Sequence, residues 1–137
     1  MSIATDIVQE LQSDDTLMDI LTGGVYTDKA EINRQDVPDA FDANGEILPC
    51  ALVKLGVETP RGPYSRSVQT PLIIYFYQRA GYTSIGGAMT RTYNLLHEKK
   101  VGSTTWQVLY DSSVFHQRDA ALDCPLSTLR FIAVLSR

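Results

Sequence analysis

Glycines that follow an apolar stretch could form a phosphate-binding loop, and they are the first candidates for chemistry in this sequence. The segment GYTSIGGAMT, residues 81–90, lies between the apolar run PLIIYFYQ and a helical pattern. A Walker loop needs GxxxxGK[ST], whose lysine reaches the phosphates, and this segment has no lysine. A dinucleotide fingerprint needs GxGxxG within a β-α-β unit, whereas the glycines here are Gly81, Gly86 and Gly87. Both nucleotide-binding patterns are excluded, and the segment is predicted to be a turn that leads into a helix.

The other residues that could act in catalysis or bind metals are few and scattered. His97 and His116 have no second His or Cys at ligand spacing, so a metal site is not expected. Neither a GxSxG nor an HExxH motif occurs. Carboxylate pairs such as Asp14 and Asp15 stand at a helix start, where carboxylates cap backbone amides. The sequence therefore predicts a protein that is not an enzyme and binds no cofactor and no metal.

Size, charge and cysteine usage exclude further classes. The 137 residues predict one domain, 1–137. The net charge of −4 lacks the basic excess that a freestanding duplex-binding protein uses. The chain has no apolar stretch of membrane-spanning length and no secretory signal, which predicts the cytoplasm or a particle assembled there. Cys50 and Cys124 form no CxxC pair and are predicted to be two buried thiols, with a disulfide as the alternative.

Two helices and a long polar segment are predicted to position the N-terminal third. The first helix has Ser2 as its expected N-cap, and the second begins at Ser13 or Asp14 and stops at Gly23. Residues 30–48, here called the excursion, are polar and contain an Asn-Gly signal that predicts a small hairpin. The apolar positions of the two helices are Ile3, Ile7, Val8, Leu11, Leu17, Met18, Ile20 and Leu21.

Alternating apolar residues predict a sheet in the rest of the chain. The segments PCALVKLGVE and PLIIYFYQ are predicted strands, joined by a loop of about a dozen residues, TPRGPYSRSVQT, residues 59–70. Three further strands, TTWQVLYD, SVFHQRDAAL and PLSTLRFIAVLSR, follow a helix. Because the connections are short, neighbouring strands are expected to be antiparallel. The predicted fold is an α+β domain with a single, mostly antiparallel sheet of four to five strands, N-terminal helices and one helix (about 84–100) packed on the sheet.

The helix predicted from Ser84 to about Lys100 has a regular apolar stripe. Ser84 is its expected N-cap, and Lys99 and Lys100 are expected at its C-terminal end, where the helix dipole favours cations. Gly86 and Gly87 are expected in the first turn, where a missing side chain would let the helix approach the sheet closely. The stripe that packs on the sheet consists of Ile85, Ala88, Met89, Thr92 and Leu96.

Two of the predicted strands are apolar on both faces, so both faces of the sheet must be covered. The second face would be covered by the N-terminal helices or by another subunit. Tyrosine and arginine on that face, and in the 59–70 loop, are residue types that are enriched in interfaces. The loop is expected to be mobile in the free subunit and ordered by a neighbour. An obligate assembly is therefore favoured over a catalytic monomer, and the expected contact residues are Arg61, Tyr64, Arg66, Tyr75, Tyr77 and Arg130.

The order of these patterns resembles the tail-completion and tail-terminator proteins of tailed bacteriophages. An N-terminal amphipathic helix leads to a junction that runs from Leu21 through Gly23 and Gly24 to Val25 and Tyr26. The proline-led strand LPCALVKLG follows, and then TPLIIYFYQRAGYTSIGGAMTRTYNLLH gives a strand, a turn and a helix. IIYFYQRA and RFIAVLSR match the family's strand before the helix and its final strand. The chain departs from the family in its excursion, which is longer than usual.

The resemblance implies a structural subunit of the virion neck that is assembled in the host cytoplasm. It implies a ring of copies of this chain, typically a hexamer, that ends the tail tube. The implied partners are the tail tube protein and the head completion or connector protein, with DNA passing through the lumen only as cargo. The alternative is a small nucleic-acid-binding or other interaction module with a ferredoxin-like sheet, on which Tyr75, Tyr77 and Arg79 would stack bases. No residue constellation favours the third reading, a small enzyme.

Overall fold

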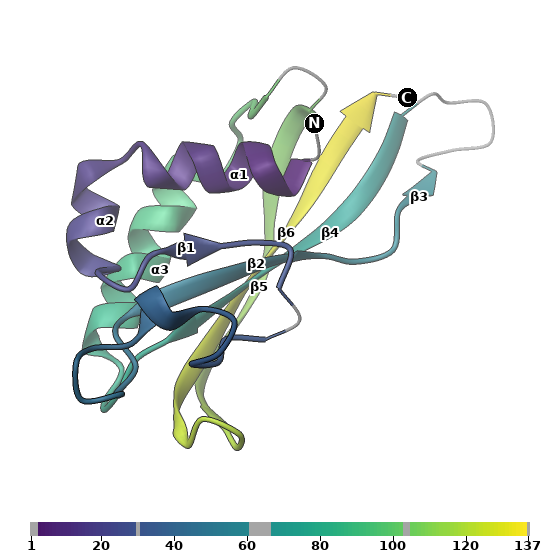
Figure 1. Cartoon of the computed structure of the whole chain (residues 1–137). Helices are drawn as coiled ribbons and strands as arrows, with labels where there is room; N and C mark the ends of the chain where they lie inside the picture. The colour runs from purple at the N-terminus through teal and green to yellow at the C-terminus, as the bar shows by residue number, and fades with distance from the viewer. Residues whose placement is uncertain (1–2, 30, 61–66, 103–104, 137) are drawn as a thin grey trace.

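A single twisted sheet forms the centre of the computed structural model, which describes residues 3–29, 31–60, 67–102 and 105–136 (Figure 1). Among these residues the sheet has six strands in the order β1-β2-β4-β6-β5, and β3 pairs with β4. β1 runs parallel to β2, and all other pairs are antiparallel. The strands are β1 (Val25–Tyr26), β2 (Cys50–Leu55), β3 (Thr59–Pro60), β4 (Ser67–Tyr77), β5 (Thr105–Asp119) and β6 (Cys124–Ser136). The predicted α+β class with a mostly antiparallel sheet is confirmed.

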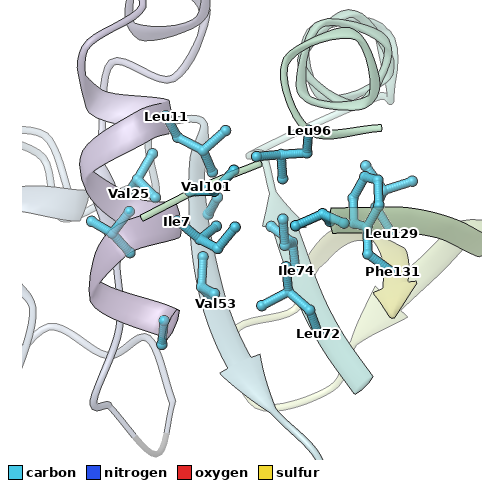
Figure 2. Close-up of a cluster of buried hydrophobic side chains, with 14 of the residues drawn as sticks. Ile7, Leu11, Val25, Val53, Leu72, Ile74, Leu96, Val101, Leu129 and Phe131 are labelled. Carbon is cyan, nitrogen blue, oxygen red and sulfur yellow. The ribbon is translucent and has the colours of Figure 1, made fainter. Parts of the chain in front are cut away.

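Three α-helices lie on one face of this sheet: α1 (Ile3–Gln12), α2 (Asp15–Ile20) and α3 (Thr83–Leu96). Figure 2 shows Ile7 and Leu11 of α1 and Leu96 of α3 facing the strands. The residues of the main core from β2, β4 and β6 are Ala51, Val53, Leu72, Ile74, Phe76, Leu129, Phe131, Ala133 and Leu135, all at most 8% exposed. This stripe-on-sheet packing is the arrangement that the periodic patterns predict. None of the helices in the described residues is long and apolar enough to cross a lipid bilayer.

The cap of α2 also ties two helices together. The Asp14 carboxylate caps α2 by accepting from Leu17 N at 2.9 Å, as predicted. The same carboxylate accepts two hydrogen bonds from Arg91 of α3, at 2.7 and 2.9 Å. The hydrogen bonds from Arg91, with that from the Leu17 amide, lower the pKa of Asp14 from 3.8 to about 2, against the opposing effect of burial. The expected cap of α1, Ser2, lies outside the described residues.

The prediction that the second helix stops at Gly23 is wrong. The helix already ends at Ile20, and Leu21 is its C-cap. A Cβ on Gly23 would lie 3.0 Å from Leu48 Cβ and from the Pro49 carbonyl oxygen, and Gly23 N donates to that oxygen at 2.8 Å. Gly23 is therefore needed where two chain segments approach closely, in the way that side-chain-free residues permit.

The predicted stripe of α3 is confirmed, because Ile85, Ala88, Met89, Thr92 and Leu96 are all buried. The expected cap is wrong: the helix starts at Thr83, and Gln78 Oε1 accepts from Ile85 N at 3.0 Å in place of a Ser84 cap. It ends at Leu96, so both lysines lie beyond it, and Lys99 forms a bridge with Val108 of β5.

The expected role of the two glycines of α3 is also wrong. A Cβ on Gly86 would meet nothing within 4 Å, and one on Gly87 only Ile20 Cδ1 at 3.9 Å. Both glycines point away from the sheet, because the buried stripe occupies the side of the helix that faces it.

Two predicted strands are one strand in the structure. Residues 105–119, which span most of TTWQVLYD and SVFHQRDAAL, form the single strand β5, and it pairs with β6 over nearly its whole length. The register shifts between Tyr110 and Ser112 and between Val114 and Gln117. Such bulges insert unpaired residues and reverse the alternation of faces. The sequence pattern is interrupted there, which is why it predicts a break.

The predicted loop at 59–70 is wrong at both ends. Thr59–Pro60 forms β3, and residues 67–70 belong to β4, which pairs with β3 there. Residues 61–66 lie outside the described residues, and with them Arg61, Tyr64 and Arg66. The predictions made for these three side chains stay predictions.

The excursion carries a second, smaller core. Its described part contains a 3-10 turn (Pro38–Ala40) and a bridge between Phe41 and Ile47, closed by the predicted Asn44-Gly45 turn. Asp42 Oδ1 accepts from Asn44 N at 2.9 Å and from Glu46 N at 3.0 Å, which fixes that turn. The buried members of this core are Ile32, Val37, Ala40, Ile47, Cys50, Leu52, Tyr77 and Cys124. The predicted small hairpin is confirmed.

Candidate functional site

In the part of the chain that the structure describes, the excursion covers one end of the sheet face opposite the helices. There the excursion packs over Cys50 and Leu52 of β2 and Tyr77 of β4. In the described residues no helix packs on the remainder, since the apolar sides of α1, α2 and α3 all belong to the other face. The half-buried and exposed residues of the remainder are here called the open face: Lys54, Pro71, Ile73, Tyr75, Leu109, Ser112, Arg130 and Ile132. Thr128 and Val134, which lie on the same side of β6, are buried.

The open face has a row of paired residues at its centre. Lys54 pairs in register with Ile73, and Ile73 pairs with Arg130, so all three side chains project to the same side. The Lys54 ammonium lies 5.8 Å from the centre of the Tyr75 ring, within cation–π range. Arg130 is exposed beside Ile73. Two cations thus flank an aliphatic side chain on a surface that is otherwise apolar or uncharged.

Arg130 differs from the other arginines that the structure describes. Arg79, Arg91 and Arg118 each pair with a carboxylate, on Glu46, Asp14 and Asp123. Arg34 donates to the Gly45 carbonyl at 2.6 Å and lies over the Phe41 ring. Among the described residues Arg130 makes no hydrogen bond, ion pair or ring contact. Its guanidinium, with five donors in a fixed fork, is available for a carboxylate or phosphate.

Of the three expected contact residues that the structure describes, two lie on the open face and the third is buried. Tyr75 and Arg130 share the open face. Tyr77 is only 5% exposed beneath the excursion, and burial raises the pKa of its hydroxyl, with a further contribution from Asp119. The excursion, rather than the N-terminal helices, covers this end of the second face. The sequence did not indicate this covering, because the apolar residues of the excursion that are buried in the second core have no periodic spacing.

The two predicted buried thiols are confirmed in the structure, where Cys50 and Cys124 are free and buried in the second core. Burial is the main reason that the pKa of Cys50 rises from 9.0 to about 12 and that of Cys124 to about 11. Thiols with pKa values this high are almost fully protonated at neutral pH and are therefore poor nucleophiles.

Both histidines are held in aromatic contacts. The His97 ring stacks on Tyr93, with centres 4.8 Å apart, and its Nδ1 accepts from Tyr110 N at 3.0 Å. His116 stacks on Tyr82 at 4.4 Å. Among the described residues no three His, Cys, Asp or Glu side chains are grouped so that they could hold a metal. These contacts explain the histidines as parts of the packing between α3 and β5.

A groove between α3 and β5 was not predicted from the sequence. It has a volume of about 300 Å³ and is lined by Met89, Thr90, Tyr93, Tyr110, Ser113, Phe115 and Leu129. Phe115, on its rim, is 58% exposed. Phe115 in the segment SVFHQRDAAL could have indicated the groove. The sequence does not show which face Phe115 occupies, because the bulges of β5 interrupt the alternation of faces. None of these lining residues carries a charge, and two of their polar groups, the hydroxyls of Tyr110 and Ser113, are hydrogen-bonded to each other at 2.7 Å. The groove therefore offers mainly apolar contact.

Two solved structures share this fold over nearly its whole length. One is a chain of the virion of a native gene transfer agent particle, with a TM-score of 0.67 and 14% identity, covering 99% of this chain and 96% of that chain. The other is the bacteriophage SPP1 gp17 protein, with a TM-score of 0.52 and 12% identity, covering 97% of this chain and 88% of that chain. No protein-family model and no curated protein matches the sequence. At these identities the likeness shows a common fold.

Proposed function

We propose that this chain is a structural protein of the neck of a tailed-phage-like particle. It forms a ring at the end of the tail tube, ends tail assembly and joins the tail to the head connector. The observation that carries this proposal is the end-to-end likeness to a chain of a gene transfer agent virion, with SPP1 gp17 as a second match. The order of strand, turn, helix and final strand in the sequence, which resembles tail-terminator proteins, supports it independently.

The proposed partners follow from this position. Copies of the chain bind one another in a ring, typically of six, and the ring contacts the tail tube protein and a head completion protein. DNA passes through the lumen as cargo. The net charge of −4 suits this role, because a lumen without a basic excess binds phosphates weakly. The protein acts by binding and has no catalytic role. It is assembled in the host cytoplasm and stays in the virion.

The experiment that tests the function removes the gene from the particle-producing genome and restores it in trans. Electron microscopy of the deletion should show free heads and tails of irregular length, and the wild-type gene should restore joined particles. Antibody labelling should place the chain at the head–tail junction. Normal infectious particles that lack the chain would contradict the proposal.

The side chains of Arg61, Tyr64 and Arg66 are proposed to contact a neighbouring subunit or a tail component. Changing all three to alanine should leave the melting curve of the free subunit nearly unchanged, because substitutions in a loop that is proposed to be ordered only by a neighbour cost the free subunit little stability. The same variant should complement the deletion poorly and leave unjoined heads and tails. Full complementation by the triple variant would remove these residues from the proposed contact.

The alternative, a nucleic-acid-binding module, has less support. Its stacking surface needs Tyr75, Tyr77 and Arg79 side by side on an exposed face. Tyr77 is buried beneath the excursion, and Arg79 pairs with Glu46. Binding of single-stranded DNA at low salt, with loss of binding in a Tyr75→Ala variant, would favour this alternative.

A further inference from the structure

We infer that the open face of one subunit binds the acidic N-terminal helices of a second copy of this chain. This inference rests on the proposed function and deepens it, because it names the two surfaces that meet in the ring. Two observations support it: charge is separated between the two sides of the sheet, and Arg130 on one side and Glu10, Asp15 and Asp19 on the other make no side-chain hydrogen bond or ion pair among the described residues.

The negative charge of the chain comes from one segment. Residues 3–24, which contain α1 and α2, carry five carboxylates and neither lysine nor arginine. The rest of the chain carries 12 basic and 11 acidic side chains, so it is close to neutral. The five carboxylates are those of Asp6, Glu10, Asp14, Asp15 and Asp19.

Three of these carboxylates are available to a partner. Asp14 is engaged by Arg91, whereas Glu10, Asp15 and Asp19 are exposed and make no side-chain hydrogen bond or ion pair among the described residues. Asp15 stands in the first turn of α2, where it stabilises the helix dipole. Asp19 stands in the last turn, where the dipole disfavours a carboxylate. Local helix stability therefore does not explain Asp19.

The open face offers the complementary groups. Arg130 has no partner among the described residues, and Lys54 lies in the same row. Ile73 and Ile132, both half-buried, are the neighbours of Arg130 on this face, one across the strand pair and one along β6. Arginines that lose contact with water on binding often contribute much of the binding energy of an interface. The planar guanidinium also binds a carboxylate with two hydrogen bonds.

The position of the two surfaces determines the kind of assembly. The helices and the open face lie on opposite sides of one sheet (Figure 1). A contact between them is heterologous, since it uses a different surface on each copy, and it produces a closed ring or an open filament. A two-fold dimer through either surface would place like charges against each other, which is unfavourable.

DNA is the other polyanion that could contact Arg130. The open face carries only Lys54 and Arg130 as cations in the described residues, and the whole chain has a net charge of −4. Affinity for DNA at physiological salt comes from several neutralised phosphates. Two cations beside aliphatic side chains fit a small number of carboxylates on a protein better, so the second copy is the favoured occupant.

The test measures self-association by sedimentation velocity at protein concentrations up to about 1 mM, a weak-binding limit. The wild-type protein should associate, and Arg130→Glu should raise the dissociation constant at least about a hundredfold, as loss of a desolvated charge pair does. The double variant Glu10→Lys and Asp19→Lys should behave in the same way. Lys100→Glu is the matched control, because it makes the same charge change at an exposed lysine outside the open face and should leave association unchanged.

Mixing the variants tests the pairing itself. Arg130→Glu and the Glu10→Lys/Asp19→Lys double variant should each be monomeric, and an equimolar mixture should associate again. In the mixture every contact joins an acidic surface to a basic one. Melting curves check that each variant folds, and Arg130→Ala replaces Arg130→Glu if the latter does not.

Three results would overturn the inference: a wild-type protein that stays monomeric up to about 1 mM, an Arg130→Glu variant that associates like wild type, or a mixture that does not associate. Loss of DNA binding in Arg130→Glu with unchanged self-association would assign the face to nucleic acid instead. The proposed function fails separately, through normal particles from the gene deletion. If the gene proves necessary for joined particles but self-association does not depend on Arg130, only the present inference is refuted and the proposed function stands.

Discussion

Ile73 and Ile74 are neighbours on β4, and they show how differently the two faces of the sheet are built. Ile74 is fully buried beneath the helices, whereas Ile73 is half-buried between Lys54 and Arg130. Regular helices cover the first face along its length, and in the described residues an irregular segment covers one end of the second. Apolar residues on both faces therefore show that both need covering, but not that the same chain supplies the cover.

The largest effect is expected from placing a charge beneath the helices. Met89 of α3 is 3% exposed in the main core. Met89→Asp should lower the free energy of unfolding by about 4 kcal/mol, because it buries an unpaired carboxylate or forces α3 off the sheet. Urea denaturation at pH 7 measures this, with Thr90→Asp on the exposed side of α3 as the control. An unchanged midpoint for Met89→Asp would contradict the packing of α3.

The two isoleucines of β4 give a matched comparison of the faces. Ile74→Ala should cost about 3 kcal/mol, because it leaves a cavity in a fully buried site. Ile73→Ala should cost about 1 kcal/mol in the free subunit, because its side chain still contacts water. Chemical denaturation at low protein concentration measures both losses in the free energy of unfolding. Equal losses would show that the open face is covered within the subunit.

The third prediction concerns the ion pair between Asp14, which caps α2, and Arg91 of α3. Asp14→Ala should cost about 1 kcal/mol at pH 7, a typical value for an N-cap. The pKa of Asp14 is lowered in the fold, from 3.8 to about 2, so its ionic contribution is present above pH 3.8 and is lost as the pH falls toward about 2.

Stability curves of wild type and Asp14→Ala should therefore converge over that acidic range. A gap that stays constant down to pH 2 would contradict the role of the Arg91 pair.

The smallest effect is expected at a helix position that contacts nothing. Gly86→Ala should raise the free energy of unfolding by about 0.5–1 kcal/mol, because alanine favours the helix and a Cβ there has open space. Gly23→Ala is the opposite case and should destabilise, since its Cβ would collide with Leu48 and Pro49. Thermal melts of both variants measure the difference. Destabilisation by Gly86→Ala would instead indicate that α3 needs a glycine there to pack closely against its neighbours.

Periodic segments could be predicted from the sequence because their burial follows one rule along their length. The stripe of α3 and the alternation of β4 and β6 belong to this group. The alternation also predicts that Arg130 and Tyr75 share one face. It could not show that Arg130 lacks a partner, since pairing depends on which side chains the fold brings near.

Irregular segments could not be predicted in the same way. In the excursion, Ile32, Val37, Ala40 and Ile47 have no common period, so nothing in the sequence indicated a second core or the burial of Tyr77. In β5 the bulges reverse the faces, which concealed both the length of the strand and the groove beside Phe115. The helix cap from Gln78 comes from the preceding loop, where no local motif announces it.

The position of β4 has a consequence for hydrogen exchange. Its residues 72–77 pair with β2 on one side and with β6 on the other. An amide in such a strand can reach solvent only when a large part of the sheet opens, whereas amides on the free side of an edge strand exchange through local opening. We expect deuterium uptake to be slowest in 72–77 and in β6, which lies between β4 and β5, and much faster along β5 between the two bulges. These slow amides would report the global stability of the subunit directly, and they would do so in the free protein and in the assembled particle alike.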